Sequence, residues 1–261
     1  MVIIKSFVSA ISLFSKIPMP SLDYKEGDDR YSLCFFPVVG LVLCFFVCGL
    51  VWLLQYMEGV NRLDGKYWEL IVTLVYIMLP VALTGGIHVD GFVDTMDAMH
   101  SYGNIEKKLE ILKDPHIGAF GVIKLLELVG IWIVGLMIAG TRFMPLAALG
   151  FIISRAMSGI SVIMFRPAKP TGMLVYEKSS SARKVSIVVL FLWILITWSI
   201  GVLRYGVMGV AIIVASTFCF VYYRYRANKE FGGVTGDTSG CFLVLTETTV
   251  IVLIAALSLV I

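Results

Sequence analysis

Apolar runs long enough to cross a lipid bilayer recur along the whole of this 261-residue chain. A transmembrane helix needs roughly 20 consecutive apolar residues. Only 15% of the residues here are charged, against roughly 25% in an average soluble domain. The pattern therefore predicts an all-α fold, a polytopic transmembrane helical bundle of about seven spans that forms a single integral membrane domain over residues 1–261. The expected spans are Leu33–Leu54, Trp68–Gly86, Ala119–Gly140, Phe143–Phe165, Val185–Val202, Gly206–Tyr223 and Cys241–Ile261.

The first residues form an apolar segment, Met1–Phe14, that is too short to span the bilayer comfortably. Ile3, Phe7 and Ile11 fall on one face when this segment is drawn as a helix, and Lys5 lies off that stripe. The arrangement predicts a short N-terminal helix that lies in the membrane interface or packs on the bundle.

The distribution of lysine and arginine predicts which ends of the spans face the cytoplasm. Fifteen of these residues lie before the first expected span or in the second, fourth and sixth connections. The opposite side carries only four, namely Arg62, Lys66, Arg142 and Arg204. Because positively charged loops stay on the cytoplasmic side, the N-terminus is expected inside and, with seven spans, the C-terminus outside. The polar motifs then share the cytoplasmic face, and the small net charge of +3 does not indicate nucleic-acid binding.

One polar stretch between two expected spans, residues 85–121, carries six carboxylates. Asp90, Asp94 and Asp97 are spaced i, i+4 and i+7, which places all three on one narrow face of a helix. Carboxylates so close repel one another unless a cation lies among them, and a ligand set of oxygens favours Mg²⁺ or Mn²⁺. The stretch is therefore expected to be a cytoplasmic metal-binding motif for chemistry on phosphates. The alternative is an acidic loop that is simply solvated.

A second short helix is expected within the same stretch, over Ile105–Lys113, with Asn104 as its N-cap. Because a break precedes this helix, a helical hairpin could bring Glu110 and Asp114 to face the aspartate triplet. Asp114 is accordingly expected as a further metal ligand. His116 follows it as a candidate phosphate contact, although a histidine near a membrane interface is more often a hydrogen-bonded surface residue.

A further polar feature is Arg155, near the middle of the expected span Phe143–Phe165. An arginine costs roughly 3 kcal/mol or more at the centre of a spanning helix, so it should face the interior and pair with an anion. It could clamp a phosphate through its forked guanidinium, or it could form a structural ion pair with an aspartate of the motif. Arg166 and Lys169 follow where the span ends, and they suit either a second phosphate or the ordinary cytoplasmic flank of a span.

A glycine-rich segment lies within the expected cytoplasmic loop 224–240 and enters the last span. Its glycines and small hydroxyls resemble a backbone nest for an anion, although the lysine of a P-loop is missing. Asp237 in this segment and Glu247 in the span strengthen the prediction, because an intramembrane carboxylate is a functional candidate by default. The expected substrate-binding residues are Arg155, His116, Gly233, Thr235, Gly236, Asp237 and Glu247.

Together these features resemble the cobalamin synthase family, the adenosylcobinamide-GDP ribazoletransferases. The resemblance runs nearly from end to end, and its most specific part is the long central motif. The matching residues are Gly86-x-His88-x-Asp90-Gly91-x-x-Asp94-x-x-Asp97, then Leu109-Glu110-Ile111-x-Lys113-Asp114-x-x-Ile117-Gly118-Ala119-x-Gly121, then Arg155, and finally Gly233-x-Thr235-Gly236-Asp237-x-x-Gly240 with Glu247.

The resemblance implies an enzyme of the bacterial cytoplasmic (inner) membrane that joins adenosylcobinamide-GDP to α-ribazole or its 5′-phosphate. The reaction releases GMP and forms adenosylcobalamin or its 5′-phosphate, the nucleotide-loop assembly step of vitamin B12 biosynthesis. The family uses Mg²⁺ as a cofactor. The implied partners are the two small-molecule substrates and the lipid bilayer, and nucleic acid is not expected. A homo-oligomer is left open.

A hypothesis for the mechanism assigns roles to these residues. The expected metal ligands, for one or two Mg²⁺ on the pyrophosphate, are Asp90, Asp94, Asp97 and Asp114. Arg155 and Lys113 would add positive charge at the transferring phosphoryl group. Asp97 or Asp114 would act as general base on the ribazole hydroxyl.

Two rival functions deserve comparison with this hypothesis. Membrane phosphotransferases of the CDP-alcohol type also use regularly spaced aspartates, but they have an Ala-Arg pair after the Asp-Gly, and here Asp90-Gly91 is followed by Phe92-Val93-Asp94. An ion or proton transporter would carry carboxylates near the midplane of several spans and usually inverted repeats. The acidic residues of this chain instead gather mostly at one face.

Overall fold

The structure, a computed structural model, describes residues 1–59 and 65–261. Within these residues it has ten helices, and its single β contact is an isolated bridge between Pro167 and Val234. The expected all-α fold is therefore confirmed. The helices are α1 (Val2–Phe14), α2 (Ser32–Gly59), α3 (Gly65–Thr84), α4 (Ile87–His100), α5 (Ile105–Ile111), α6 (Ala119–Met164), α7 (Met173–Ser180), α8 (Arg183–Tyr205), α9 (Val207–Phe231) and α10 (Gly236–Ser258).

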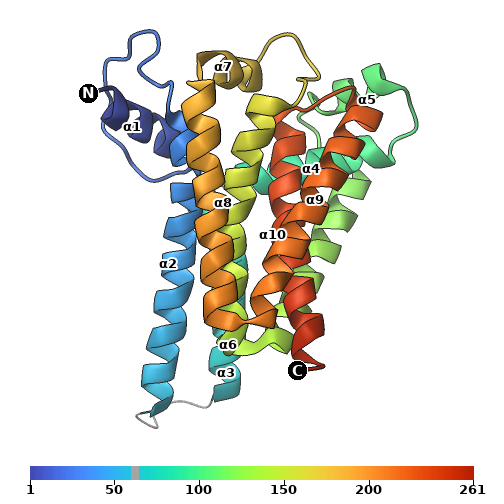
Figure 1. The fold of residues 1–261 in the computed structure, drawn as a ribbon. Coiled ribbons are helices and arrows are strands. Elements are labelled where there is room, and N and C mark those ends of the chain that lie inside the picture. The colour runs from blue at the N-terminus through green and yellow to red at the C-terminus, as the bar shows by residue number, and fades with distance from the viewer. Residues whose placement is uncertain (60–64) are drawn as a thin grey trace.

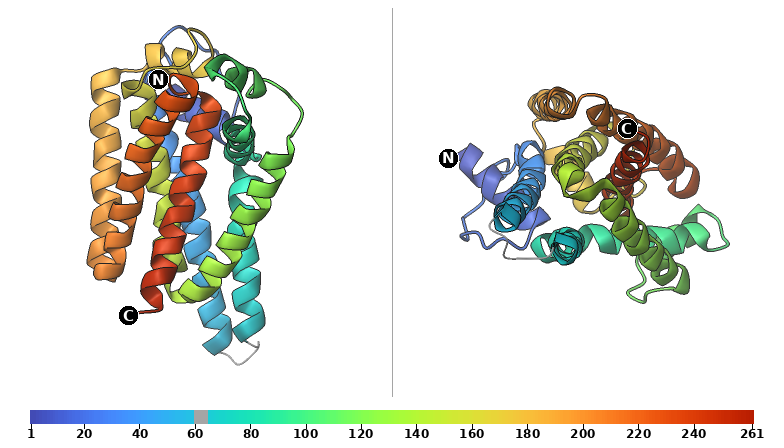
Figure 2. Two further views of the ribbon diagram at one scale, coloured as in Figure 1. Left: turned by 90° about the vertical axis from the view of Figure 1, so that its right-hand side faces the viewer. Right: turned by 90° about the horizontal axis from the view of Figure 1, so that it is seen from below.

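Six of the described helices are long and apolar enough to cross a membrane: α2, α3, α6, α8, α9 and α10. The seven expected runs fall on these six, because two of them, Ala119–Gly140 and Phe143–Phe165, are the two arms of α6. At Gly140 the backbone has φ 68° and ψ 169°, a conformation that residues with a Cβ rarely adopt. The chain turns back there, and Figure 2 shows one arm of α6 descending and the other rising through the bundle. The expected multi-pass helical bundle is confirmed.

The second arm of α6, residues 141–164, lies at the centre of the bundle. Nearly all of its residues from Met144 onward are buried, and α2, α8 and α10 pack around it. Gly40 of α2 makes one of these contacts possible, because a Cβ there would lie 2.2 Å from the Phe151 carbonyl oxygen. Small residues at such crossings let membrane helices approach closely.

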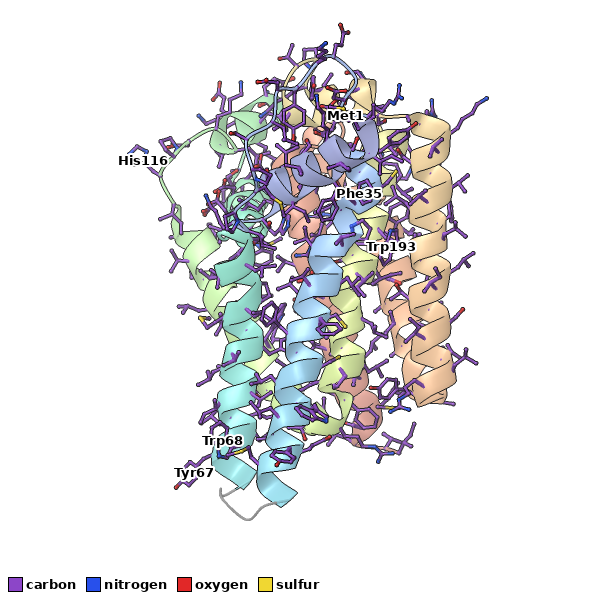
Figure 3. All side chains as sticks on the ribbon, turned by 90° about the vertical axis from the view of Figure 1, so that its left-hand side faces the viewer. Met1, Phe35, Tyr67, Trp68, His116 and Trp193 are labelled. Atoms are coloured by element: carbon purple, nitrogen blue, oxygen red, sulfur yellow. The ribbon has the colours of Figure 1, made fainter. Side chains whose placement is uncertain are left out.

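Large apolar side chains cover the outside of the bundle. Phe45, Trp52 and Leu203 are 78%, 65% and 87% exposed. Figure 3 shows side chains extending outward all around the helices, with Tyr67 and Trp68 at the end far from Met1. Contiguous apolar surface of this extent is unusual on a soluble monomer, whereas a surrounding bilayer accounts for it.

The short helix α1 packs on the bundle at one end, as expected. Its Phe14 ring lies against Phe36 of α2, with 4.0 Å between the ring centroids. The predicted contact face is partly wrong, because Ile11 is buried but Ile3 is 64% exposed. Ser6 belongs to the buried face instead, since its hydroxyl donates to a carbonyl oxygen of the loop after α1 at 2.8 Å.

The helices α1, α4, α5 and α7, which are not candidate spans, gather with the N-terminus at one end of the bundle (Figure 1). We call this the motif end. The turn between the arms of α6, the turn between α8 and α9, and the C-terminus lie at the other end. α4 lies across the bundle axis, and the left view of Figure 2 shows it almost end-on. Arg62, one of the basic residues expected on the far side, lies outside the described residues.

The expected loop 224–240 is much shorter in the structure. α9 continues to Phe231, and the loop is reduced to residues 232–235. An ion pair stabilises the extension, because Glu230 lies 2.6 Å from Lys108 of α5. The residues of this extension are largely charged or polar, so hydropathy alone could not show that the helix continues beyond the membrane.

Candidate active site

α4 carries its three aspartates across the N-terminus of α10. The chain enters α4 through Gly85 and Gly86, whose φ angles of 67° and 82° favour glycine. The two helices touch at Gly91 and Gly240, and a Cβ on Gly91 would lie 2.8 Å from the Asp237 carbonyl oxygen. The glycines of both motifs therefore let two backbones meet, and this crossing brings Asp237 close to the aspartates of α4.

Asp97 binds the beginning of α6. Its two carboxylate oxygens accept the backbone N–H groups of Gly118 and Gly121, each at 2.8 Å. The first N–H groups of a helix have no partner within the helix, and a negative charge there is favoured by the helix dipole. A Cβ on Gly118 or Gly121 would lie 2.3 or 2.4 Å from an Asp97 oxygen, so this contact requires both glycines.

Four carboxylates concentrate negative charge at the motif end. We call Asp90, Asp94, Asp97 and Asp237 the acidic cluster. The pKa of Asp94 is raised to about 6, first by its partial burial and then by the charges of Asp90, Asp237 and Asp97. A divalent cation would relieve this repulsion, and carboxylate oxygens are ligands that Mg²⁺ prefers. The donor chemistry of the acidic cluster therefore fits the expected ion.

The acidic cluster is not a complete metal cage. Within residues 1–59 and 65–261, no three histidine, cysteine, aspartate or glutamate side chains are placed so that they could hold an ion. Mg²⁺ in phosphate-handling enzymes is usually bound by one or two carboxylates together with substrate phosphates. Oxygens of a bound pyrophosphate could therefore complete the ligand shell here.

The glycine-rich loop closes on the ends of two helices. Gly232 ends α9 in the left-handed conformation at φ 71°, and its N–H donates to the Asn228 carbonyl. Thr235 and Thr238 exchange side-chain-to-backbone hydrogen bonds of 2.8 and 3.1 Å at the start of α10. The N–H groups of Gly232, Thr235 and Thr238 therefore serve a helix end and a capping box, and the anion nest stays a prediction.

The same loop is pinned to the segment that follows α6. The Val234 N–H donates to the Arg166 carbonyl at 2.9 Å. Gly233 is required here, because a Cβ would lie 2.5 Å from that carbonyl oxygen. This pairing brings Lys169 close enough to Asp237 for their charges to interact. Lys169, for which the sequence left open a second phosphate or an ordinary cytoplasmic flank, is therefore a candidate site residue.

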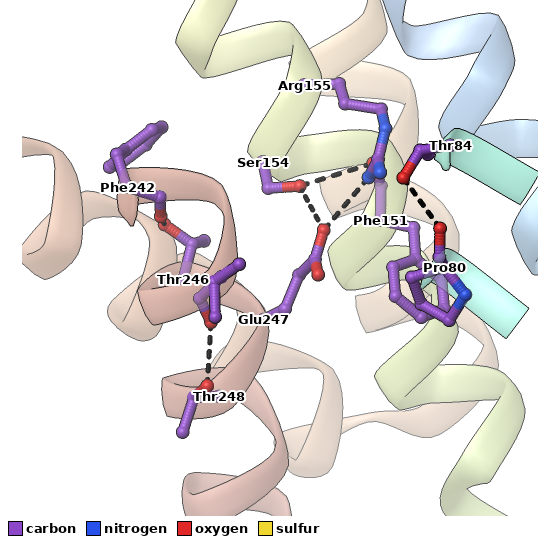
Figure 4. Close-up of polar contacts among 10 residues, drawn as sticks. Pro80, Thr84, Phe151, Ser154, Arg155, Phe242, Thr246, Glu247 and Thr248 are labelled. Atoms are coloured by element: carbon purple, nitrogen blue, oxygen red, sulfur yellow. Dashed lines mark hydrogen bonds and ion pairs between the residues drawn. The ribbon is translucent and has the colours of Figure 1, made fainter. Parts of the chain in front are cut away.

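Arg155 is paired deep inside the bundle and not with the motif. Its Nη1 lies 2.9 Å from Glu247 Oε1, which also accepts the Ser154 hydroxyl at 2.9 Å (Figure 4). The Arg155 and Glu247 side chains are only 1% and 5% exposed. The expected structural pair with a motif aspartate is therefore wrong, because α10 supplies the partner. The phosphate clamp stays a prediction. Both residues line a cavity of about 310 Å³, and Arg155 Nε has no hydrogen-bond partner among the described residues.

Asp114 and His116, in the loop after α5, contact each other at the surface. α5 begins at its Asn104 cap, whose side chain accepts a backbone N–H as expected, but it ends before Lys113. Asp114 Oδ1 lies 2.7 Å from His116 Nδ1, and these side chains are 55% and 88% exposed. Figure 3 shows His116 at the outer edge of the molecule. The ion pairs of Glu110 and Asp114 are with Lys107 and His116 and not with the aspartates of α4, and Asp114 as a metal ligand stays a prediction.

Comparison with known proteins gives consistent matches over the whole chain. A family model described as cobalamin-5-phosphate synthase matches residues 6–255. A protein named adenosylcobinamide-GDP ribazoletransferase from Lachnoclostridium phytofermentans is 36% identical over 241 residues, which cover 91% of this chain and 88% of the relative. A protein of the same name from Treponema denticola is 32% identical, over 95% of this chain and 96% of its own length. Another from Clostridium perfringens is 27% identical, over 96% of this chain and 97% of its own length. No solved structure matches significantly.

Proposed function

Because this chain belongs to the cobalamin-5-phosphate synthase family, we propose that it is an adenosylcobinamide-GDP ribazoletransferase. The reaction joins adenosylcobinamide-GDP to α-ribazole or α-ribazole 5′-phosphate. A ribazole hydroxyl attacks the phosphorus on the cobinamide side of the pyrophosphate, the bond from that phosphorus to the bridging oxygen breaks, and GMP leaves. The product is adenosylcobalamin or its 5′-phosphate, and its nucleotide loop is assembled in this step.

The observation that carries the proposal is the acidic cluster at the motif end of a membrane bundle. Phosphoryl transfer needs positioning and charge neutralisation more than covalent chemistry by the protein. The crossing of α4 and α10 holds four carboxylates together, and Lys169 is close enough to one of them, Asp237, for their charges to interact. These are the groups that a site for a cation and a pyrophosphate requires.

One or two of the carboxylates of Asp90, Asp94 and Asp237 would hold Mg²⁺, together with oxygens of the bound pyrophosphate. When bound, the ion would neutralise the pyrophosphate and stabilise the leaving phosphate of GMP. Asp97 has a different task in this proposal, because the N-terminus of α6 already binds both of its oxygens. It fixes α4 against α6 and so positions the rest of the acidic cluster. A role of Asp97 or Asp114 as general base stays a prediction.

Lys169 is proposed to supply the positive charge that the sequence placed on Lys113 and Arg155. Lys169 lies beside Asp237, whereas Lys113 is exposed in the loop after α5 and Arg155 is neutralised by Glu247. An ammonium group at this place could bind a non-bridging oxygen of the phosphate under attack. It would thereby stabilise charge that develops in the transition state.

The motif end is proposed to face the cytoplasm at a bacterial inner membrane. Its helices and connections carry most of the lysines and arginines that the positive-inside rule assigns to the cytoplasmic side. The six apolar helices support a multi-pass membrane protein. Adenosylcobinamide-GDP carries a charged pyrophosphate and is water-soluble, so an active site that opens to the cytoplasm suits its supply.

Transferase activity of the purified protein in liposomes tests the proposed function. Adenosylcobinamide-GDP and α-ribazole would be supplied with Mg²⁺, and the corrinoid product and GMP would be measured together. We expect both products in equal amounts, lost on adding EDTA and restored by excess Mg²⁺. A folded preparation that forms neither product, but turns over CDP-activated alcohols offered in parallel, would contradict the proposal and favour the rival phosphotransferase.

A further inference from the structure

A small apolar pocket lies next to the acidic cluster and has no role in the function described so far. Its volume is about 120 Å³, and its walls come from α1, α2, α4, α6, α7 and α10. We call it the α7 pocket, because α7 contributes Met173, Leu174 and Glu177 to its wall. The other large apolar residues of its lining include Phe14, Leu33, Phe36, Val162 and Leu243.

Two polar atoms in the wall of the α7 pocket have no hydrogen-bond partner among the described residues. They are His88 Nε2 and Glu177 Oε1, and both are buried. The other Glu177 oxygen accepts the Ser32 hydroxyl at 2.8 Å, which fixes the carboxyl, and Glu177 as a whole is only 4% exposed. Buried polar atoms without partners cost free energy. His88 also lines a second cavity, with Arg155 and Glu247, but the α7 pocket is the one whose lining includes both His88 and Glu177, and two such atoms on its residues point to a ligand that pairs with them.

The α7 pocket borders the acidic cluster at the crossing of two helices. His88 precedes Asp90 on the first turns of α4, and Gly236, also in the pocket wall, directly precedes Asp237 on α10. The backbones of these two helices touch here through Gly240. A ligand with one end in the pocket can therefore extend its other end into the acidic cluster.

We propose that the α7 pocket binds the aromatic base of the ribazole substrate, and that His88 and Glu177 bind the polar atoms of this nucleoside. The inference rests on the proposed function. α-Ribazole carries a flat dimethylbenzimidazole ring, which is apolar at its methylated end and has one ring nitrogen free to accept a hydrogen bond. An apolar cavity of about 150 Å³ binds a whole benzene ring, so the smaller α7 pocket is of a size to take only the edge of the base that carries the two methyl groups.

The polar atoms match the rest of the nucleoside. A neutral histidine with its proton on Nε2 donates to the free ring nitrogen, and Glu177 Oε1 accepts from a ribose hydroxyl. The ribose then extends toward the acidic cluster, where its reacting hydroxyl meets the pyrophosphate. The acyl chain of a lipid would fill the same apolar volume, but it would leave both polar atoms without partners.

The KM for each substrate, measured separately, tests the contact with Glu177. In Glu177→Gln the acceptor is replaced by an amide, and we expect the KM for α-ribazole to rise roughly tenfold. The KM for adenosylcobinamide-GDP should change by no more than roughly twofold. Glu106→Gln, the same chemical change on the exposed surface of α5, serves as the matched control and should change neither KM.

A second variant tests the volume of the pocket. Leu174→Phe narrows it, and Leu192→Phe on the outer surface of α8, where Leu192 is 51% exposed, is the control. In Leu174→Phe we expect kcat/KM to fall roughly tenfold more for α-ribazole than for the riboside of unmethylated benzimidazole. This ratio corresponds to the transfer free energy of two methyl groups. A merely structural effect of the substitution would lower both values equally.

The outcomes separate this inference from the proposed function. If the wild type makes product but both pocket variants leave the KM and the base preference unchanged, the base binds elsewhere and the inference is wrong while the function stands. An equal rise of both KM values in Glu177→Gln also contradicts it. If a folded wild type makes no product, the function fails first, and the pocket assignment falls with it. Size-exclusion profiles and thermal unfolding show that each variant is folded.

Discussion

The molecule holds its carboxylates in two contrasting environments. At the motif end, Asp94 is surrounded by three other aspartates of the acidic cluster, and its pKa is raised to about 6. Deeper in the bundle, Glu247 is 5% exposed and lies 2.9 Å from Arg155, which neutralises it. The first group places several negative charges near one another and reaches the surface at Asp90, whereas the second pairs one carboxylate with one guanidinium inside the bundle.

This contrast distinguishes a site from a structural contact. Like charges held together destabilise the folded protein, so such a cluster is best explained by a ligand that balances it. The Arg155–Glu247 pair joins the central arm of α6 to α10, and it satisfies both charges within the protein. We expect this pair to hold in place the helix whose first turn carries Asp237. Residue type alone does not reveal the difference, because both groups are charged residues in an apolar chain.

The substitution Asp94→Asn is expected to have the largest effect. Turnover should fall roughly a thousandfold, because the central carboxylate of the acidic cluster is lost. Thermal stability should stay the same or rise, since one of several like charges is removed. Activity and thermal unfolding would be measured on the same detergent preparation, with Asp23→Asn, in the exposed loop after α1, as the matched control. Full turnover in Asp94→Asn would exclude the acidic cluster as the active site.

The substitution Arg155→Met should show the opposite pattern. It leaves Glu247 buried without a partner, and the free energy of unfolding should fall by about 3 kcal/mol. The double variant Arg155→Met/Glu247→Gln should recover most of this loss, and its turnover should stay within roughly tenfold of the wild type. Unfolding in mixed micelles measures the stability. A stable single variant without activity would show that Arg155 binds substrate, as the sequence first suggested.

The contact between Asp97 and α6 gives an intermediate effect. In Gly121→Ala the added Cβ would lie 2.4 Å from an Asp97 oxygen, so the carboxylate must move. A small displacement of a positioning group can lower turnover roughly a hundredfold. Gly130→Ala on the same arm is the control, because nothing lies within 4 Å of its added Cβ. It should keep full activity and gain up to about 1 kcal/mol in stability. Equal behaviour of the two variants would mean that Asp97 does not position the site.

The smallest effect is expected in the loop after α5. His116→Ala and Asp114→Asn remove exposed groups that contact each other outside the acidic cluster, so turnover should change by no more than roughly twofold. A steady-state assay over both substrate concentrations measures this. A hundredfold loss in either variant would show that this loop closes over the acidic cluster during catalysis, and it would restore the roles predicted from the sequence.

Local features of this chain could be predicted from the spacing of its residues. Three features depend only on residues within a few helical turns of one another. They are the apolar runs, the helix with Asp90, Asp94 and Asp97, and the Asn104 cap. The expected bundle and the crowding of these aspartates follow from such local rules. The sequence predicts the end of the sixth span at Tyr223, but α9 continues to Phe231. Charged residues mark where a span leaves the membrane, and they do not stop the helix itself.

Contacts between distant segments could not be predicted in the same way. Arg155 and Glu247 lie 92 residues apart, and the sequence shows their charges but not their pairing. A glycine-rich turn looks the same whether its N–H groups face a ligand or, as around Gly232, the end of a helix. One feature of the sequence indicates the position of Lys169, which lies between Pro167 and Pro170. Prolines favour an extended backbone, and an extended segment can pair with a neighbouring one.

Binding of Mn²⁺ as a substitute for Mg²⁺ tests the central claim most directly. Electron paramagnetic resonance would count the bound ions in the presence of adenosylcobinamide-GDP and without α-ribazole, so that no turnover occurs. Three proteins are compared: the wild type, Asp94→Asn, and the double variant Arg155→Met/Glu247→Gln. We expect tight binding in the wild type and in the double variant, and its loss in Asp94→Asn. Unchanged binding in Asp94→Asn, or loss only in the double variant, would contradict the assignment of the acidic cluster as the metal site.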